Sequence, residues 1–131
     1  MKYGLGALTD KWLDTPPQKK GEPDIVMYIK QTNEPFGAIE VSGSDKVKMP
    51  RTLWVRPDKL KAAESEEYPT WFWMVYTNMI RVISQAAVKR HEKEVINTSP
   101  YGVKEKYIEI PYAESEEPEA LFKWIKGKLE P

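Results

Sequence analysis

Two segments of this chain are apolar on both faces, and this feature restricts the possible folds more than any other. Residues 24–30 read Asp-Ile-Val-Met-Tyr-Ile-Lys, and residues 70–76 read Thr-Trp-Phe-Trp-Met-Val-Tyr. Successive side chains of a strand alternate between the two faces of its sheet, so such segments belong where both faces are covered. The sequence therefore predicts a mixed α/β fold, a mixed central β-sheet flanked by helices, with residues 70–76 at its centre.

The other elements are expected in the order helix, strands, helix, strands, helix, strand, helix. Asn33 and Pro35 predict a turn that joins residues 24–30 to a second strand at 36–42 in an antiparallel hairpin. Residues 79–84 fit a strand, which we favour, or the start of a helix. The remaining expected elements are a helix at 5–14, an extended segment at 53–55, helices at 57–66 and 85–94, a strand at 107–110 and a last helix capped by Ser115.

Length and composition limit both the number of domains and the available chemistry. The length suits one compact domain, which we expect to span residues 1–131. Cysteine is absent and His91 is the one histidine, which excludes disulfides and thiolate nucleophiles and argues against a histidine metal cage. Any chemistry must then use carboxylates and other oxygen ligands.

The sequence contains neither an apolar run of membrane-spanning length nor an export leader. The expected location is therefore intracellular, with no secretion and no membrane partner. Lys plus Arg and Asp plus Glu number 20 each, so the formal net charge is zero. A nucleic-acid partner would need a local basic patch.

The residues that point to chemistry lie on two neighbouring expected strands. Asp24 follows Pro23 at the start of the first strand, and Glu40 and Ser42 lie two residues apart on the second. Alternation places Glu40 and Ser42 on one face, and a hairpin can bring Asp24 near both. Two carboxylates at one sheet edge suit Mg²⁺ or Mn²⁺, which would activate a water and offset the charge of a phosphodiester.

This arrangement resembles the PD-(D/E)xK nuclease superfamily, in which Pro-Asp begins one core strand and Asp/Glu-x-Lys lies on the next. The resemblance covers residues 5–76 and implies a restriction-endonuclease-like fold. It also implies that Asp24 and Glu40 bind Mg²⁺ or Mn²⁺. The family's lysine helps to position or activate water, but Ser42 stands in its place here.

The resemblance offers two replacements for the missing lysine, since some members of the superfamily carry it at a displaced position. These are Lys46 and Lys48, in the loop after the second strand. The catalytic set expected from the resemblance is therefore Asp24, Glu40, Ser42, Lys46 and Lys48. In an alternative, purely structural interpretation, Asp24 ends a turn and Glu40 forms an ion pair with a lysine.

A basic run directly follows the expected metal-binding strand. Between residues 45 and 61, six Lys or Arg residues stand against two Asp residues. Grouped cations can hold a phosphate backbone, and Trp54 can stack a base or simply pack. The residues expected to contact nucleic acid are Arg51, Trp54, Arg56, Lys59 and Lys61. A solvated loop and helix face is the alternative interpretation.

Two functions from different classes fit these features. The first is a nucleic-acid-binding protein that acts as a Mg²⁺-dependent endonuclease if its degenerate site retains activity. The second is a non-enzymatic assembly protein, such as a virion component, that forms a homo-oligomer through a face containing Trp71 and Trp73. The absence of cysteine and the low Asn and Gln content are typical of thermophilic proteins and resemble small proteins of archaeal viruses or plasmids.

The basic run leads to a first testable prediction. Neutralising Arg51, Arg56 and Lys59 together should weaken nucleic-acid binding and flatten its salt dependence. The log–log slope on duplex DNA changes by about 0.9 for each phosphate that the protein no longer neutralises. Binding titrations at several salt concentrations measure this slope, and a wild-type chain without binding at low salt would mean that the run is only solvated surface.

Overall fold

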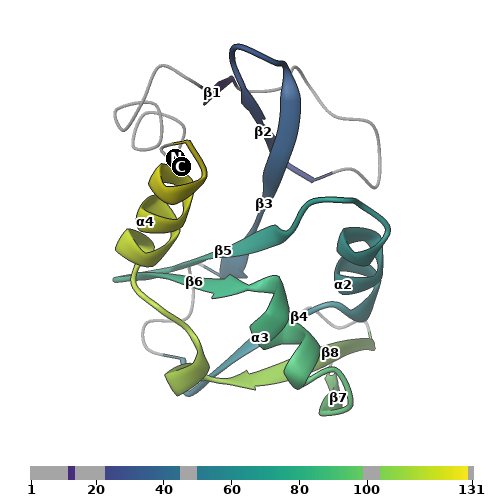
Figure 1. Cartoon of the computed structure of the whole chain (residues 1–131). Coiled ribbons are helices and arrows are strands. Elements are labelled where there is room, and N and C mark those ends of the chain that lie inside the picture. Colours follow the sequence, from purple (N-terminus) through teal and green to yellow (C-terminus); the bar gives the residue numbers. More distant parts are fainter. Residues whose placement is uncertain (1–11, 14–22, 45–49, 99–103, 130–131) are drawn as a thin grey trace.

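A computed structural model of the chain describes residues 12–13, 23–44, 50–98 and 104–129. These residues form a five-stranded sheet in the order β1-β2-β3-β5-β6 and a three-stranded sheet in the order β4-β8-β7 (Figure 1). The strands are β1 (Trp12–Leu13), β2 (Ile25–Ile29), β3 (Glu34–Ser44), β4 (Thr52–Val55), β5 (Thr70–Tyr76), β6 (Ile80–Ser84), β7 (Val95–Thr98) and β8 (Glu105–Pro111).

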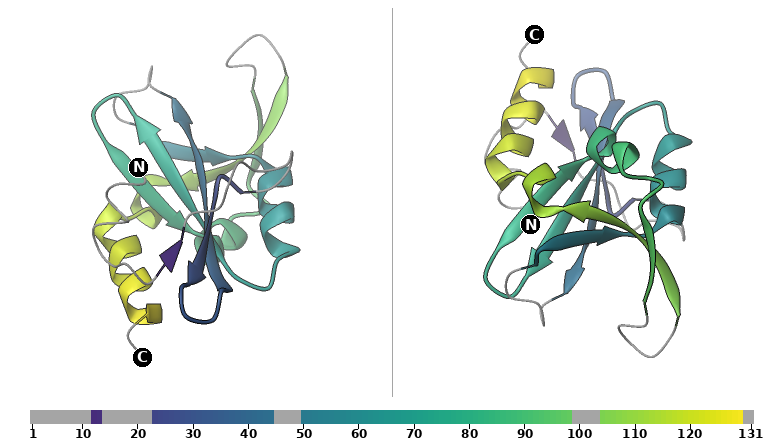
Figure 2. Two further views of the ribbon diagram at one scale, coloured as in Figure 1. Left: turned by 90° about the horizontal axis from the view of Figure 1, so that it is seen from above. Right: turned by 90° about the horizontal axis from the view of Figure 1, so that it is seen from below.

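The helices of the described residues cover both faces of the larger sheet. They are α2 (Pro57–Glu64), α3 (Gln85–Arg90), the short 3₁₀ helix η1 (Tyr112–Glu114) and α4 (Pro118–Leu129). Figure 2 shows α4 on one side of the larger sheet and α2 on the other. The smaller sheet and α3 lie on the α2 side and pack into the same core as α2. None of the helices in this part of the chain is long and apolar enough to cross a lipid bilayer.

The predicted mixed sheet is confirmed. β2 and β3 form the expected antiparallel hairpin, and Asn33 in its turn has a φ of 59°. β3 then pairs in parallel with β5, and β5 pairs antiparallel with β6. β5 is therefore an interior strand, as its two apolar faces predict.

Each face of β5 contributes to a separate core. Phe72 and Met74, each 1% exposed, pack with α2, α3 and the smaller sheet. Trp71 and Trp73 point to the opposite face and pack with α4. Seven consecutive apolar or small residues are needed here because neither face of β5 meets water.

The face that contains Trp71 and Trp73 is not an open surface for a homo-oligomer, which corrects that expectation. Both side chains are 7% exposed. The ring of Trp71 lies 5.8 Å from that of Trp124, and the ring of Trp73 lies 6.2 Å from that of Phe122. Aromatic side chains of α4 thus occupy the surface that a second copy would need.

The predicted helix at 5–14 is wrong at its described end, because Trp12 and Leu13 form β1. Trp12 pairs with Ile29 and Leu13 with Tyr28 at the outer edge of β2. Pairing there satisfies backbone groups that an edge strand leaves free, and this outweighs the helical spacing of the apolar residues. Residues 5–11 and 14 lie outside the described residues.

The second half of the chain differs from the prediction in a helix end, an additional strand and a helix cap. α3 ends at Arg90, and residues 95–98 form β7, a strand that the sequence pattern does not predict. Ser115 does not cap the last helix: its hydroxyl donates to Tyr112 O at 2.6 Å and accepts from Arg81 Nε at 2.9 Å. The buried guanidinium of Arg81 takes Ser115 as a partner, so the capping pattern is used for a tertiary contact.

Both outer edges of the larger sheet are partly covered. β1 pairs with β2 at one edge. At the other edge, Val82 of β6 exchanges two backbone hydrogen bonds with Glu116, each 2.8 Å long. The segment between η1 and α4 therefore adds a single bridge to the sheet.

Gly43 allows β3 and β5 to approach each other near the end of their parallel pairing. Its φ is 110°, and a Cβ atom added there would lie 2.2 Å from the carbonyl oxygen of Val75. A side chain at this position meets both an unfavourable backbone conformation and a backbone clash.

We expect Gly43→Ala to lower the free energy of unfolding by about 1–3 kcal/mol. Ser42→Ala is the control, because Ser42 is the exposed neighbour on the same strand and should change stability by less than about 0.5 kcal/mol. Urea denaturation of the three proteins measures the difference. Equal stability of Gly43→Ala and wild type would show that the strands can separate here without cost.

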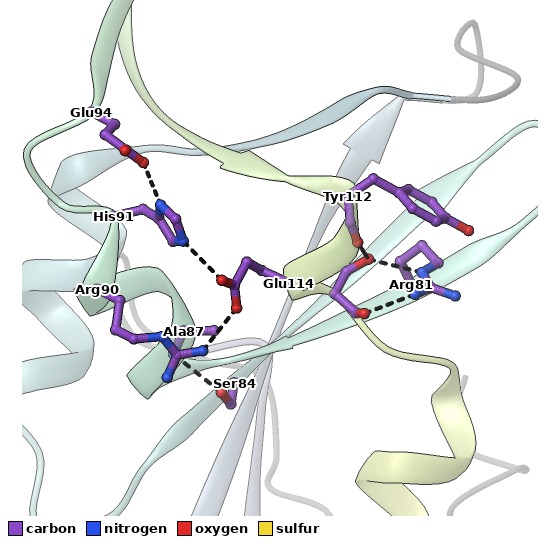
Figure 3. A network of polar contacts seen from close by, with 9 residues as sticks. Arg81, Ser84, Ala87, Arg90, His91, Glu94, Tyr112 and Glu114 are labelled. Carbon is purple, nitrogen blue, oxygen red and sulfur yellow. Dashed lines mark hydrogen bonds and ion pairs between the residues drawn. The ribbon is translucent and has the colours of Figure 1, made fainter.

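A charged cluster at the end of α3 joins this helix to η1 (Figure 3). His91 Nδ1 is hydrogen-bonded to Glu94, and Nε2 lies 3.4 Å from Glu114 Oε1, an ion-pair distance. The other oxygen of Glu114 accepts from Arg90 at 2.9 Å. The hydrogen bond to Glu94, and next to it the Glu114 carboxylate, raise the pKa of His91 against the opposing effect of desolvation.

The sign of this shift gives a pH prediction. Because the folded-state pKa is raised, charged His91 contributes stability below its ordinary pKa of about 6.5, and this is lost as pH rises through the folded value. The pKa of Glu114 is lowered, foremost by Arg90 and then by His91, so its contribution is lost at the acid end instead. Between about pH 6 and 9 the melting temperature should fall more for wild type than for His91→Gln. Parallel curves for the two proteins would contradict this.

Candidate metal site

Asp24 directly precedes β2 and lies close to Glu40. Ile25, the first residue of β2, pairs with Ile39, so Asp24 and Glu40 are the next residues beyond this pair at the same end of the ladder. The two carboxylates are near enough for the negative charge of Asp24 to act on Glu40. Asp24 Oδ2 also accepts a hydrogen bond of 2.7 Å from the Val41 N–H. This bond orients the Asp24 carboxylate at the end of the β2–β3 pairing.

Glu40 lies on an interior strand, and this determines its electrostatics. β3 has β2 on one side and β5 on the other, with Glu40 paired to Phe72. The Glu40 side chain is 13% exposed and forms an ion pair of 3.2 Å, Oε1 to Lys59 Nζ. Burial raises the pKa of Glu40, the negative charge of Asp24 raises it further, and Lys59 opposes both.

A small cavity of about 60 Å³ lies beside Glu40, between the sheet and α2. Glu40, Thr70 and Pro23 line it on the strand side, and Lys59, Ala62 and Glu66 line it on the side of α2 and the turn that follows. Thr70 is 2% exposed, and its Oγ1 has no hydrogen-bond partner among the described residues. The Thr70 N–H, by contrast, donates to Gln85 Oε1 at 2.7 Å.

The donor set fits a hard divalent cation that retains most of its water. Mg²⁺ usually binds proteins through one or two carboxylates and completes its shell with water and substrate phosphate. Within the described ranges, no group of three or more His, Asp or Glu residues is arranged to hold a metal ion. Asp24 and Glu40 are the described carboxylates that would hold Mg²⁺ or Mn²⁺ in the arrangement expected from the sequence, and the hydroxyl of Thr70 lines the adjoining cavity.

The other residues of the expected catalytic set contribute less to this geometry. Ser42 is exposed, two residues beyond Glu40 on the same strand and paired with Met74. Lys46 and Lys48 lie outside the described residues. The ion pair of Glu40 with a lysine agrees with one element of the structural interpretation.

The residues expected to contact nucleic acid fall into different environments. Arg51 and Lys61 are exposed, and Arg56 pairs with the exposed Asp58 at 3.1 Å. Lys59 instead contacts Glu40.

Trp54 packs on the ring of Tyr107, with 5.5 Å between ring centroids. Its Nε1 donates to Thr52 Oγ1 at 3.2 Å, and the hydroxyl of Thr52 donates to Glu109 Oε2. A carboxylate is thus linked to the Trp54 side chain, and the residues of the basic run do not all share one environment.

Sequence reasoning missed the contact between Lys59 and Glu40 and the role of Thr70 in the cavity. The position of Lys59 in the basic run points to nucleic acid as its partner. The sequence did contain a signal for the contact with Glu40. Leu60 and Ala63 are the buried residues of α2, so Lys59, which precedes Leu60, flanks the buried stripe of this helix. No pattern in the sequence marks Thr70 as more than the first residue of a strand.

Comparisons with known proteins identify the fold. No protein-family model matches the sequence, and no curated protein matches it. Among solved structures, Hjc, a Holliday junction resolvase from the archaeal hyperthermophile Archaeoglobus fulgidus, is similar with a TM-score of 0.53 and 13% identity over 92% of this chain and 88% of that one. A nuclease from a fusselovirus is similar with a TM-score of 0.60 and 16% identity over 96% of this chain and 82% of that one. The chain shares the fold of these two structures, which is the restriction-endonuclease-like fold expected from the sequence.

Proposed function

We propose that this chain binds nucleic acid and hydrolyses its phosphodiester bonds with Mg²⁺ or Mn²⁺ held by Asp24 and Glu40. The carrying observation is the proximity of these two carboxylates at one end of the β2–β3 pairing, where Glu40 lines a cavity. The fold, shared with a resolvase and a viral nuclease, supports the same proposal. Uncharged ligands, or two acids far apart, would not support a metal-dependent hydrolysis.

The two carboxylates have different tasks in this proposal. Asp24 has one oxygen on the Val41 N–H, so its orientation is set by the β3 backbone. Glu40 is the less exposed of the two residues that would hold the cation, and a bound cation would offset the repulsion from Asp24 that raises the Glu40 pKa. A bound divalent cation would polarise the phosphodiester and make water more acidic.

The substrate class follows from charge. Asp24, Glu40 and Lys59 sum to a charge of −1, so a divalent cation changes the site to +1, opposite to the single negative charge of each phosphodiester. The exposed cations Arg51 and Lys61 support contacts to neighbouring phosphates. We therefore propose a polyanionic substrate, a nucleic acid strand, bound along the α2 side of the sheet.

Glu40→Gln tests the proposal. The amide keeps the shape of the side chain but not its charge, so Mn²⁺ binding should be lost, and plasmid nicking with it, while the fold is kept. Glu66→Gln is a matched control, because Glu66 lines the same cavity from the side of α2. Titration calorimetry with Mn²⁺ measures affinity, and thermal unfolding checks the fold. Equal Mn²⁺ affinity in wild type and Glu40→Gln would remove the nuclease proposal.

A further inference from the structure

We propose that Lys59 supplies the ammonium group that the strand lacks at Ser42, so that the catalytic lysine of this chain comes from helix α2. This inference rests on the proposed function. It differs from the expectation that Lys46 or Lys48 replaces the motif lysine, because it uses a residue that already contacts the metal-binding carboxylate.

The first support is the contact itself. Lys59 Nζ lies 3.2 Å from Glu40 Oε1. The Lys59 side chain is 35% exposed, so it reaches from solvent into the site and is not confined there. A lysine ammonium is a compact charge on a flexible four-carbon stem, which lets it change partners over a few ångströms.

The second support is the way α2 is fixed. Leu60 and Ala63 are buried in the core, which sets the rotation of the helix against the sheet. Lys59, Ala62 and Ala63 then line the cavity together, at the i, i+3 and i+4 spacing of one helix face. The two alanines are small and leave space beside the lysine, so α2 presents an ammonium group across the cavity from the strand.

The third support is the Thr70 hydroxyl group in the cavity, together with space for a water molecule. Thr70 Oγ1 is buried and lacks a partner among the described residues, and Thr70 lines the cavity with Lys59 and Glu40. A volume of about 60 Å³ can hold a water molecule, which needs several polar partners. The Thr70 hydroxyl, the Glu40 carboxylate and the Lys59 ammonium are such partners.

These groups give Lys59 a defined role in hydrolysis. The water oxygen bonds to phosphorus while the bond from phosphorus to the leaving sugar oxygen breaks. The water gives its proton to solvent, and the leaving oxygen takes one from solvent. With Glu40 and Asp24 as the residues that would hold the cation, the protonated Lys59 would donate to the attacking oxygen or to a phosphoryl oxygen and stabilise the developing negative charge. Neutral Ser42 cannot do this.

The test compares Lys59→Met, which removes the charge and keeps the length, with Lys123→Met, a substitution of an exposed lysine of α4, on the opposite side of the larger sheet. Lys59→Met should lower the nicking rate at least about 100-fold at saturating Mn²⁺, and Lys59→Arg should restore part of it. Mn²⁺ affinity by calorimetry should stay equal or become tighter in Lys59→Met, because the competing ammonium is gone. Lys123→Met should retain the wild-type rate.

Three results would overturn the inference. If wild type nicks DNA and Lys59→Met nicks it equally fast, the ammonium comes from elsewhere, and loss of activity in Lys46→Ala or Lys48→Ala would locate it. If Lys59→Met loses Mn²⁺ binding together with activity, Lys59 only supports the ligands. If wild type binds Mn²⁺ but never cleaves, the proposed hydrolysis fails as well. The first two results leave the proposed function standing, which separates the two failures.

Discussion

The burial of one carboxylate is the constraint on which this structure depends. Glu40 lies on the strand between β2 and β5, where its side chain is largely withdrawn from water, and a charge in such a place requires partners. α2 supplies a cation from across the cavity, and the residue that precedes β2 brings a second acid close to Glu40. An interior strand would be more stable with a valine at this position. The cost of the carboxylate is therefore an argument that the site has a use beyond stability.

Asp24, Glu40 and Lys59 can form either a structural ion pair or a reaction centre. The two interpretations differ in the charge that remains unpaired. A structural salt bridge would neutralise itself, but Asp24 adds a second negative charge that no described ion pair offsets. Counted over the described residues alone, Asp24, Glu40 and Lys59 leave one negative charge without a partner. The site is also open on one side, since Lys59 is about one-third exposed. Excess negative charge with access from solvent favours a mobile counterion.

The periodicity of the sequence predicted the contacts that depend on neighbouring strands. It did not predict the contacts that depend on how a helix packs against the sheet. Asp24 and Glu40 could be paired in advance because alternation and a short turn determine a hairpin. Lys59 could not, since its partner depends on how Leu60 and Ala63 rotate α2 against the sheet. Ser115 matched a capping pattern but bonds to Arg81, a residue 34 positions away. The prediction at β1 was wrong for another reason: a strand of two residues is too short to show alternation, so the helical spacing around it decided the prediction.

The single bridge between Val82 and Glu116 has a consequence for crowding on a polyanion. Proteins gathered along a nucleic acid strand are held at high local concentration, and an open strand edge invites a second molecule to extend the sheet. The bridge occupies the middle of β6, and β1 occupies part of β2 at the opposite edge. Little main chain of this sheet is left to template such growth. Within the described residues, these two contacts therefore limit the backbone groups through which the sheets of neighbouring copies would join.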